Sequence, residues 1–296
     1  MRPGTATPAR GEGRPVALVC AYRGAGFAGF QRQAGPRTVQ QVLEAALGDL
    51  AGRAVAVRGA GRTDAGVHAL GQVVDCRLPP SVRMPAARLP LALQARLPAD
   101  AAAVAAWDVP PDFDARFSAL SKRYRYLIWR DPVASPFWRD CAWHRAGPLD
   151  VAAMAEAARA LAGRHDFAAF AGSARPVADA TRTVLECTVR SAPPWLAIDV
   201  EADGFLYRMV RAIAGTLVEV GRGALRPADV PRILAEGRRA EAGPSLPPWG
   251  LCLLHVRYPR RFGLPPAAPA PWPPGGPFLT AGVSGRKVYR LSFRKE

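Results

Sequence analysis

The sequence contains no apolar run that approaches the roughly 20 residues of a membrane-spanning helix, although 49% of its 296 residues are hydrophobic. Its first fifteen residues, MRPGTATPARGEGRP, also lack the apolar core of a secretory signal peptide. The missing features argue against a helical membrane protein, and the hydrophobic content is ample for a buried core. We therefore expect a soluble, cytoplasmic protein.

Cysteine and histidine are scarce, with five and four residues respectively. No two cysteines stand in C-x-x-C spacing, and they are scattered over positions 20, 76, 141, 187 and 252. An odd number of widely spaced cysteines indicates neither a disulfide framework nor a zinc cluster. The pattern is typical of a protein from a reducing compartment.

Acidic residues are outnumbered, since 24 Asp and Glu face 40 Lys and Arg, which gives a formal net charge of +16. Most of the cations are arginine, whose guanidinium binds phosphate through two parallel hydrogen bonds and stacks on bases. A surplus of this size favours a polyanionic partner, most simply a nucleic acid. An Ala/Arg/Pro-biased composition explains the same surplus without a partner, so charge alone leaves both readings open.

The hydrophobic periodicity predicts an α+β fold. Helices and strands alternate, yet several strands follow one another directly, which favours antiparallel sheets in two similar halves. Thr38 and Gln41 form a capping box before a helix, Asp150 caps a second helix that ends at Gly163, and a third helix spans about residues 205 to 220. The expected parts are an extension (1–15), an N-terminal half (16–112), a C-terminal half (113–262) and a Pro/Gly-rich basic tail outside the fold (263–296).

The stretch RGAGRTDAGVHALGQ, residues 58–72, raises the question of function. It is no dinucleotide fingerprint, because Asp64 stands where the third glycine of G-x-G-x-x-G belongs and would repel pyrophosphate. The segment that follows alternates like a strand and not like a helix. We therefore predict two strands joined by a glycine-shaped loop with a charged tip.

Five stretches together resemble the TruA-type tRNA pseudouridine synthases between about residues 16 and 262. Phe30 and Arg208 depart from that pattern, because relatives often carry Trp and His there. The matching stretches are FAGFQRQ, AGRTDAGVHALGQVV, FDARFSALSKRYRYLI, FLYRMVRAIAGTLVEVG and WGLCLLHVRYP. The resemblance implies the pseudouridine synthase fold, with two similar half-domains and an active-site cleft between them.

The resemblance makes Asp64 the nucleophile. Taken alone, an aspartate between glycines is more often a turn residue that caps its own backbone. Arg62 would displace the target base and hold the flipped nucleotide, although a single arginine is usually a solvated surface residue. Tyr124 would stack on the base and assist proton transfer, where the plainer reading is a core aromatic. Tyr126 shares its face and fits that plainer reading better.

Arg211 lies one step off the apolar stripe of its helix, where a charged side chain usually reaches out to water. The resemblance instead makes it the ion partner of Asp64, and we expect a bidentate pair. Leu251 would contact the target base. Gln31 and Arg116, in the first and third matching stretches, complete the expected substrate-binding residues.

The resemblance implies conversion of uridine to pseudouridine at positions 38, 39 and 40 of the tRNA anticodon stem-loop, by a homodimer without a cofactor. His68 and Asp64 are too few ligands for a metal ion, so no metal is expected. Two alternatives stay open: a pseudouridine synthase that acts on another RNA, and a non-catalytic RNA-binding module.

Overall fold

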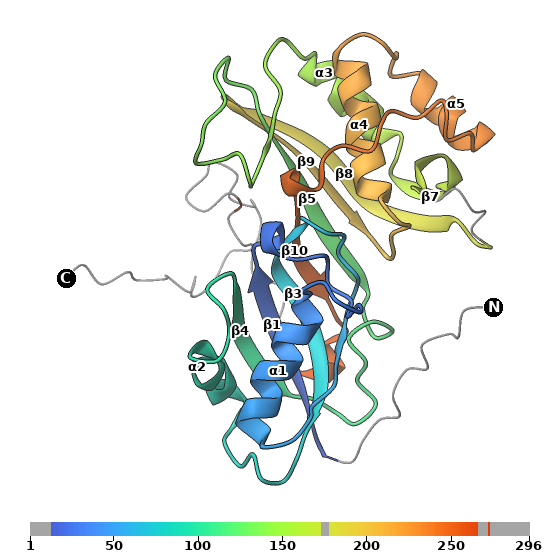
Figure 1. Ribbon diagram of the computed structural model, residues 1–296. Coiled ribbons are helices and arrows are strands. Elements are labelled where there is room, and N and C mark those ends of the chain that lie inside the picture. The colour runs from blue at the N-terminus through green and yellow to red at the C-terminus, as the bar shows by residue number, and fades with distance from the viewer. Residues whose placement is uncertain (1–12, 173–177, 266–271, 273–296) are drawn as a thin grey trace.

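The computed structural model describes residues 13–172, 178–265 and 272 (Figure 1). Its strands are β1 (Arg14–Tyr22), β2 (Val57–Gly59), β3 (His68–Leu78), β4 (Ala101–Asp108), β5 (Ser121–Trp129), β6 (Trp143–His144), β7 (Gly163–Asp166), β8 (Thr181–Ala192), β9 (Trp195–Ala202) and β10 (Leu251–Arg257). Its α-helices are α1 (Val39–Ala51), α2 (Leu89–Gln94), α3 (Val151–Arg159), α4 (Met209–Gly221) and α5 (Asp229–Glu236). Short 3-10 helices are η1 (Gly24–Gly26), η2 (Ala86–Arg88), η3 (Ala168–Phe170), η4 (Pro248–Gly250) and η5 (Arg260–Phe262).

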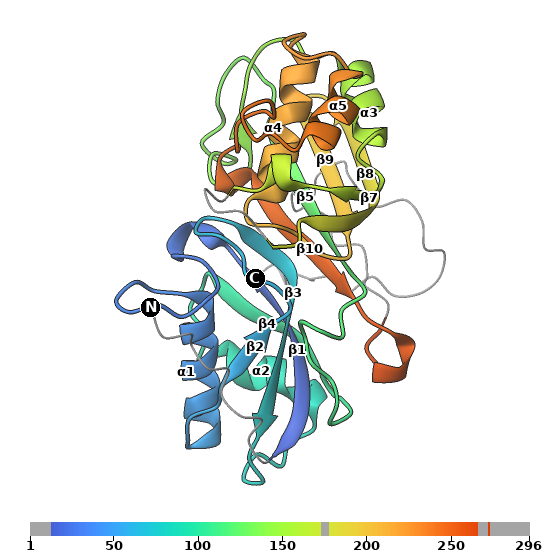
Figure 2. The same ribbon diagram turned by 90° about the vertical axis from the view of Figure 1, so that its right-hand side faces the viewer.

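One ten-stranded sheet runs through both halves in the order β4-β1-β3-β10-β5-β9-β8-β7, with β2 paired to β3 and β6 to β5. The predicted α+β class is confirmed, and most pairs are antiparallel. The two antiparallel halves are, however, not separate sheets. The late strand β10 lies between β3 and β5, parallel to the first and antiparallel to the second (Figure 2).

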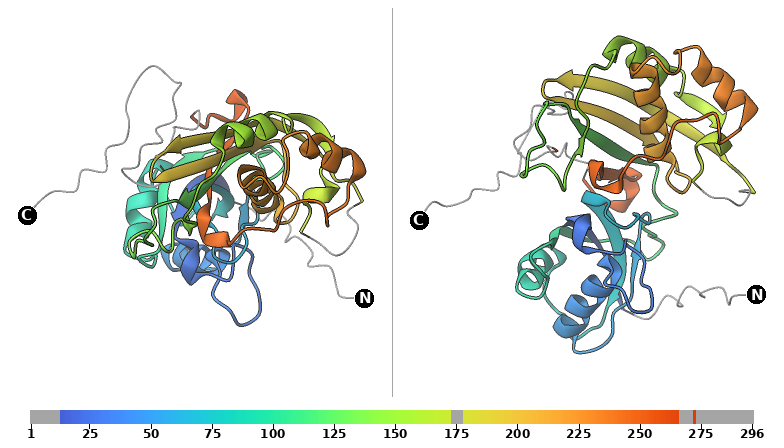
Figure 3. Two further views of the ribbon diagram at one scale, coloured as in Figure 1. Left: turned by 90° about the horizontal axis from the view of Figure 1, so that it is seen from above. Right: turned by 45° about the horizontal axis from the view of Figure 1, so that its top comes forward.

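Helices α1 and α4 lie on the same face of the sheet, one on each half (Figures 1 and 3). Leu43 and Leu47 of α1 and Ile213 and Leu217 of α4 belong to one large apolar core on that face, and each is at most 2% exposed. Removal of this much apolar surface from water is the main stabilising contribution to the fold. Among the described residues, no helix is long and apolar enough to cross a membrane.

Several local predictions are confirmed. Thr38 and Gln41 form the predicted capping box at α1, and Asp150 accepts the backbone N–H of Ala153 at the start of α3. Strand β5 places Tyr124 and Tyr126 on one face, as its alternation predicts.

Two helix boundaries differ from the predictions. Helix α4 begins at Met209 and not near 205, because Arg208 adopts a left-handed conformation (φ 59°) and turns the chain just before the helix. Helix α3 ends at Arg159, and Gly163, the predicted end, opens strand β7 instead. Its φ of 112° suits the sharp change of direction there.

The opposite face of the sheet carries a second, smaller apolar cluster. It contains one residue from beyond the predicted end of the fold, Trp272, which is 5% exposed. The Trp272 ring lies 5.3 Å from that of His68, and its carbonyl accepts a 2.9 Å hydrogen bond from Arg125 Nη1. The expectation that everything after residue 262 lies outside the fold is therefore wrong at Trp272. Residues 1–12 of the predicted extension, and the rest of the tail after 265, lie outside the described residues.

Candidate active site

The loop between β2 and β3 presents Asp64 at its tip, as the sequence predicted. Backbone hydrogen bonds fix the loop at three points. The backbone N–H of Ala60 donates to the Val73 carbonyl, and that of Phe30 donates to the Thr63 carbonyl. The backbone N–H of Val67 donates to the main-chain carbonyl of Asp64 at 3.1 Å. The carboxylate is thus attached to a loop whose backbone is held both from within and by the preceding segment.

Buried polar side chains support the same loop from below. The hydroxyls of Tyr22 and Thr63 are hydrogen-bonded at 2.9 Å, and Gln72 donates from Nε2 to the Gly61 carbonyl at 2.8 Å. All three side chains are at most 6% exposed. Buried polar groups with partners define one geometry, because any shift of the loop would leave them unsatisfied.

Glycine is required where the loop meets the preceding segment. A Cβ at Gly59 would lie 2.5 Å from Cζ of Phe30, so the aromatic ring packs directly on the glycine backbone. Gly29 has a φ of 95°, and a Cβ there would lie 2.9 Å from the Thr63 carbonyl oxygen. Phe30 thus anchors the segment against the loop that carries Asp64.

Arg211 of α4 forms the predicted ion pair with Asp64, which joins the two halves of the protein. Its Nη1 lies 3.0 Å from Asp64 Oδ2, while Nε donates to the Leu246 carbonyl at 2.6 Å. The predicted bidentate pair is wrong, because the guanidinium divides its donors between the carboxylate and a backbone oxygen. The side chains of Arg211 and Asp64 are 10% and 24% exposed, so Arg211 does not reach out to solvent.

Tyr124 and Tyr126 lie beside this pair with different surroundings. Tyr124 is 7% exposed and packs edge-on against Phe205, with ring centroids 5.0 Å apart. Burial raises the pKa of Tyr124 well above its usual range, and the nearby charge of Asp64 raises it further. Its phenol therefore stays protonated at neutral pH. Tyr126 is fully buried and donates to the Pro247 carbonyl at 2.8 Å, as expected of a core residue.

Leu251 lies on the same face of the sheet as both tyrosines, because it stands directly opposite Tyr126 in the β10–β5 pair. Arg62 is exposed on the loop, two residues before Asp64. Arg116 is exposed on the segment before β5, where its guanidinium stacks over Phe117 at 5.3 Å. Gln31 donates to Gln40 of α1 at 3.0 Å, and within the described chain no hydrogen bond joins it to Asp64.

His68 is a structural residue in this arrangement. Its Nδ1 accepts the backbone N–H of Gly24, so Nε2 carries the proton and faces the Trp249 carbonyl at 3.1 Å. Burial lowers the pKa of His68, which keeps the ring neutral. Both ring nitrogens are engaged, and across residues 13–172, 178–265 and 272 no cluster of three or more potential metal ligands occurs.

The supporting residues Tyr22, Thr63 and Gln72 were missed in the sequence. A signal was present, because Tyr22 and Gln72 adjoin apolar residues in their strands, and a buried polar side chain there must find a hydrogen-bond partner. The strand pattern alone does not say which partner that is.

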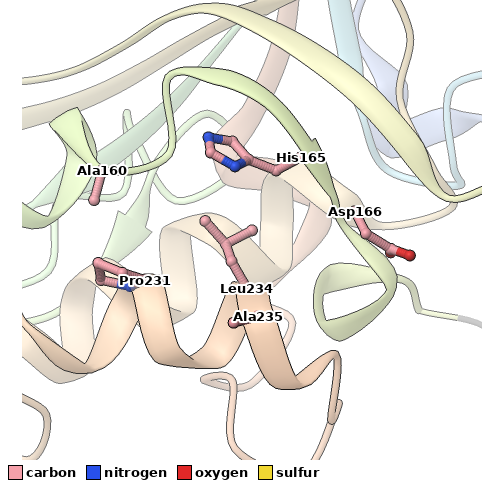
Figure 4. Close-up of a pocket in the computed structure, with 6 residues that line it drawn as sticks. All are labelled: Ala160, His165, Asp166, Pro231, Leu234 and Ala235. Carbon is pink, nitrogen blue, oxygen red and sulfur yellow. The ribbon is translucent and has the colours of Figure 1, made fainter.

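Hollows elsewhere on the surface do not include Asp64. One of about 300 Å³ lies between α5 and β7 and is lined by Ala160, His165, Asp166, Pro231, Leu234 and Ala235 (Figure 4). Another of about 250 Å³ is lined by four tryptophans, Trp129, Trp138, Trp143 and Trp249, and by smaller and polar residues between 134 and 144. Neither of these two hollows includes Asp64, so the candidate site is defined here by the chemical groups around that residue.

Comparison with known proteins agrees with the motifs. A family model described as tRNA pseudouridine synthase matches residues 18–118 and 157–259. A protein of Moorella thermoacetica named tRNA pseudouridine synthase A is 48% identical over 244 residues, which cover 81% of this chain and 98% of the relative. A protein of the same name from Methylacidiphilum infernorum is 46% identical over 246 residues, which cover 82% and 94%.

Proposed function

The chain belongs to the tRNA pseudouridine synthase family and isomerises uridine to pseudouridine in tRNA, and from this premise we propose that Asp64 is its nucleophile. We further propose that its targets are uridines 38, 39 and 40 of the anticodon stem-loop. The observation that carries the first proposal is the contact of 3.0 Å between Asp64 Oδ2 and Arg211 Nη1. It supplies a counter-charge to a carboxylate that is mostly shielded from water.

The pair leaves the carboxylate able to react. Arg211 engages Oδ2, and within the described chain no hydrogen bond reaches Oδ1. A nucleophile must stay ionised yet keep one oxygen open to the substrate. The predicted bidentate pair would have engaged both carboxylate oxygens. The observed single contact therefore suits a nucleophile better than the predicted pair does.

The reaction balances without a cofactor, because uridine and pseudouridine are isomers. Asp64 attacks the nucleotide, at the ribose or at the base, and the N1–C1′ bond breaks. The base turns, C5 bonds to C1′, C5 loses its proton, N1 gains one, and the carboxylate is released. Tyr124 is proposed to stack on the base and to assist proton transfer, and burial raises the pKa of its phenol.

The target base must leave its stack before a carboxylate can reach it. Arg62 is exposed on the loop, two residues before Asp64, and this position supports its proposed role of displacing the target base. Tyr124 and Leu251, on the same face of the sheet, supply the aromatic and apolar contacts for it. Arg116 adds an exposed cation for RNA, while the contact of Gln31 with Gln40 favours a role in the shape of its own segment.

The resemblance further implies a homodimer that works in the cytoplasm, with an N-terminal half (16–112) that carries the catalytic loop and a C-terminal half (113–262). The two proposed halves meet at the ion pair between Asp64 and Arg211, to which each half contributes one partner. Sedimentation of the purified protein at several concentrations tests the dimer directly.

The test of the function is a map of the product in tRNA. Purified enzyme is incubated with unmodified tRNAs tritiated at C5 of uridine, and release of tritium is followed while pseudouridines are located by chemical sequencing. The expected product lies at positions 38 to 40 and is lost when those uridines are replaced by cytidine. Pseudouridine only at other positions or in another RNA contradicts the proposed target, and binding without tritium release contradicts catalysis.

A further inference from the structure

Lys122 lies on the active-site face of strand β5. It precedes Tyr124 by two residues and therefore points to the same side of the sheet. In the sheet it stands opposite Val256 of β10 and Ala202 of β9. The strand that carries the active-site tyrosine thus also carries a cation on the same face.

The side chain of Lys122 packs against the catalytic loop. A Cβ at Gly61 would lie 3.4 Å from Lys122 Cε and 3.9 Å from the Tyr124 hydroxyl oxygen. Gly61 is the residue before Arg62 and three before Asp64. The end of the Lys122 methylene chain therefore lies beside the loop backbone at Gly61.

Other cations of β5 are neutralised by protein carboxylates, whereas Lys122 is not. Arg123 is ion-paired with Glu186 and Glu201, and Arg125 is paired with Asp199 at 2.7 Å. No hydrogen bond or ion pair within the described chain reaches the Lys122 ammonium. Burial lowers the pKa of Lys122, as does the charge of Arg116, while Asp203 acts in the opposite direction.

A partly buried ammonium without a counter-charge destabilises a protein, because it loses hydration and gains no ion pair. An arrangement of this kind is explained when a ligand brings the negative charge. In a protein that acts on tRNA, the anion at hand is a backbone phosphate, and a lysine binds phosphate as a compact point charge. Within the described chain no ion pair joins Lys122 to Asp64, whose cationic partner is Arg211.

We propose that Lys122 binds the RNA phosphate next to the target uridine and so positions the displaced nucleotide over Asp64. The proposal rests on the proposed function and adds a positioning residue to it. The Lys122 stem lies beside Gly61, three residues before the nucleophile. A phosphate bound there would fix the distance between the sugar of the target nucleotide and the carboxylate.

The test compares wild type with Lys122→Met, which keeps the length of the stem, and with Lys122→Arg, which keeps the charge. Affinity for tRNA is measured over a range of salt concentrations, and the single-turnover rate is measured at saturating RNA. In Lys122→Met we expect affinity to fall about tenfold, as for one charge-assisted hydrogen bond. The slope of log affinity against log salt should shrink by about 1, and Lys122→Arg should restore it.

Arg226→Met is the matched control, because Arg226 is an exposed cation in a surface ion pair with Asp229. It should leave the affinity and the salt slope unchanged. RNA with a neutral methylphosphonate at the phosphate beside the target uridine provides the second arm. This RNA should bind wild type more weakly than unmodified RNA does. In Lys122→Met the methylphosphonate should cause no further loss of affinity.

Two outcomes overturn the proposal: an unchanged salt slope in Lys122→Met, or an additional loss with the methylphosphonate RNA in that variant. If Lys122→Met instead slows the single-turnover rate at an unchanged slope, Lys122 only shapes the loop and the proposal is wrong. Failure of the proposed function would be seen separately, in the position of pseudouridine formed by wild type.

Discussion

At the scale of single residues, the proposed chemistry depends on how the fold holds Arg211. Its guanidinium contacts both Asp64 and the Leu246 carbonyl, so the charge is fixed in place before any substrate binds. A fixed charge needs no rearrangement during the reaction, which is the usual source of strong electrostatic effects in active sites. The second contact also determines what a substitution by lysine can retain.

Arg211→Leu should lower the single-turnover rate by roughly 10²–10³, the usual effect of removing one preorganised electrostatic partner. Arg211→Lys should fall between this variant and wild type, because one ammonium keeps the charge but cannot reach both acceptors as a guanidinium does. Rapid-quench measurements at saturating tRNA check both rates. A wild-type rate in Arg211→Leu would mean that the ion pair has no part in the reaction.

The lowered pKa of His68 leads to a prediction about how stability depends on pH. Its pKa is lowered in the folded protein, so below about pH 6.5 the unfolded chain binds a proton there before the folded chain does. Stability should therefore fall as the pH drops from 7 towards 5, by at most about 1.4 kcal/mol per pH unit from this group.

His68→Gln should be less stable than wild type at pH 7 and should lose stability less steeply as the pH falls. Burial lowers the pKa of His255 to about 4, and this residue keeps its own contribution in the variant. Urea unfolding at pH 5, 6 and 7 is the measurement. Equal slopes for wild type and variant would show that His68 does not titrate as described.

The sequence predicted the residue types at the site better than their contacts. The loop motif singles out Asp64, and the helical stripe places Arg211 at the margin of a buried face. The division of the Arg211 donors could not be foreseen, because Leu246 belongs to a distant segment without a regular pattern. The bond between Gln31 and Gln40 escaped prediction for a similar reason, since a loop side chain has no periodicity to orient it.

At the scale of elements, helix α4 is the most deeply packed of the helices described. Gly215 makes this possible, because a Cβ at that position would lie 1.8 Å from the carbonyl oxygen of Pro244. The backbone of the 243–246 segment therefore lies directly on the helix. The same segment carries the Leu246 carbonyl that holds Arg211, so helix packing and site geometry are coupled.

Gly215→Ala should destabilise the protein by roughly 1–3 kcal/mol or more, since the added methyl meets backbone and not a flexible side chain. Gly48→Ala in α1 is the matched control. Its Cβ would lie 3.5 Å from the nearest atom, so the variant should be stabilised by about 0.5–1 kcal/mol. Denaturant unfolding of both variants decides, and equal stabilities would contradict this account of how α4 packs.

Elements were predictable where local signals agree. Helix α1 has a capping box and a continuous apolar stripe, and β5 has a clear alternation, so both were placed well. The start of α4 was misplaced, because nothing in the sequence pattern marks Arg208 as a residue with positive φ. Strand β7 was missed because it is short and mostly exposed, and therefore carries no apolar alternation.

At the scale of the whole molecule, strand β10 joins what the sequence suggested were two separate sheets. It enters between β3 and β5 although it follows both in the chain, which brings Leu251 opposite Tyr126. Pairing between distant segments depends on the complete fold and leaves no local trace in the sequence. The α+β class was therefore predictable, whereas the continuity of the sheet was not.

The burial of Trp272 leads to a prediction about the stability of the whole molecule. Trp272→Ala should destabilise the protein by about 3–5 kcal/mol, because a buried indole is lost from the second apolar cluster. Phe137→Ala is the control, since Phe137 is 85% exposed and should matter little. Thermal unfolding compares the two. If both variants unfold like wild type, Trp272 contributes nothing to the core.

The most direct test of the account is the reaction of Asp64→Ala and Asp64→Asn with tRNA under single-turnover conditions. Asp49→Asn is the control, because Asp49 is a carboxylate on the surface, 68% exposed and paired with Arg96. We expect both Asp64 variants to bind tRNA but to form no pseudouridine, while Asp49→Asn reacts like wild type. More than trace conversion by a clean preparation of Asp64→Ala would contradict the assignment of Asp64 as the nucleophile.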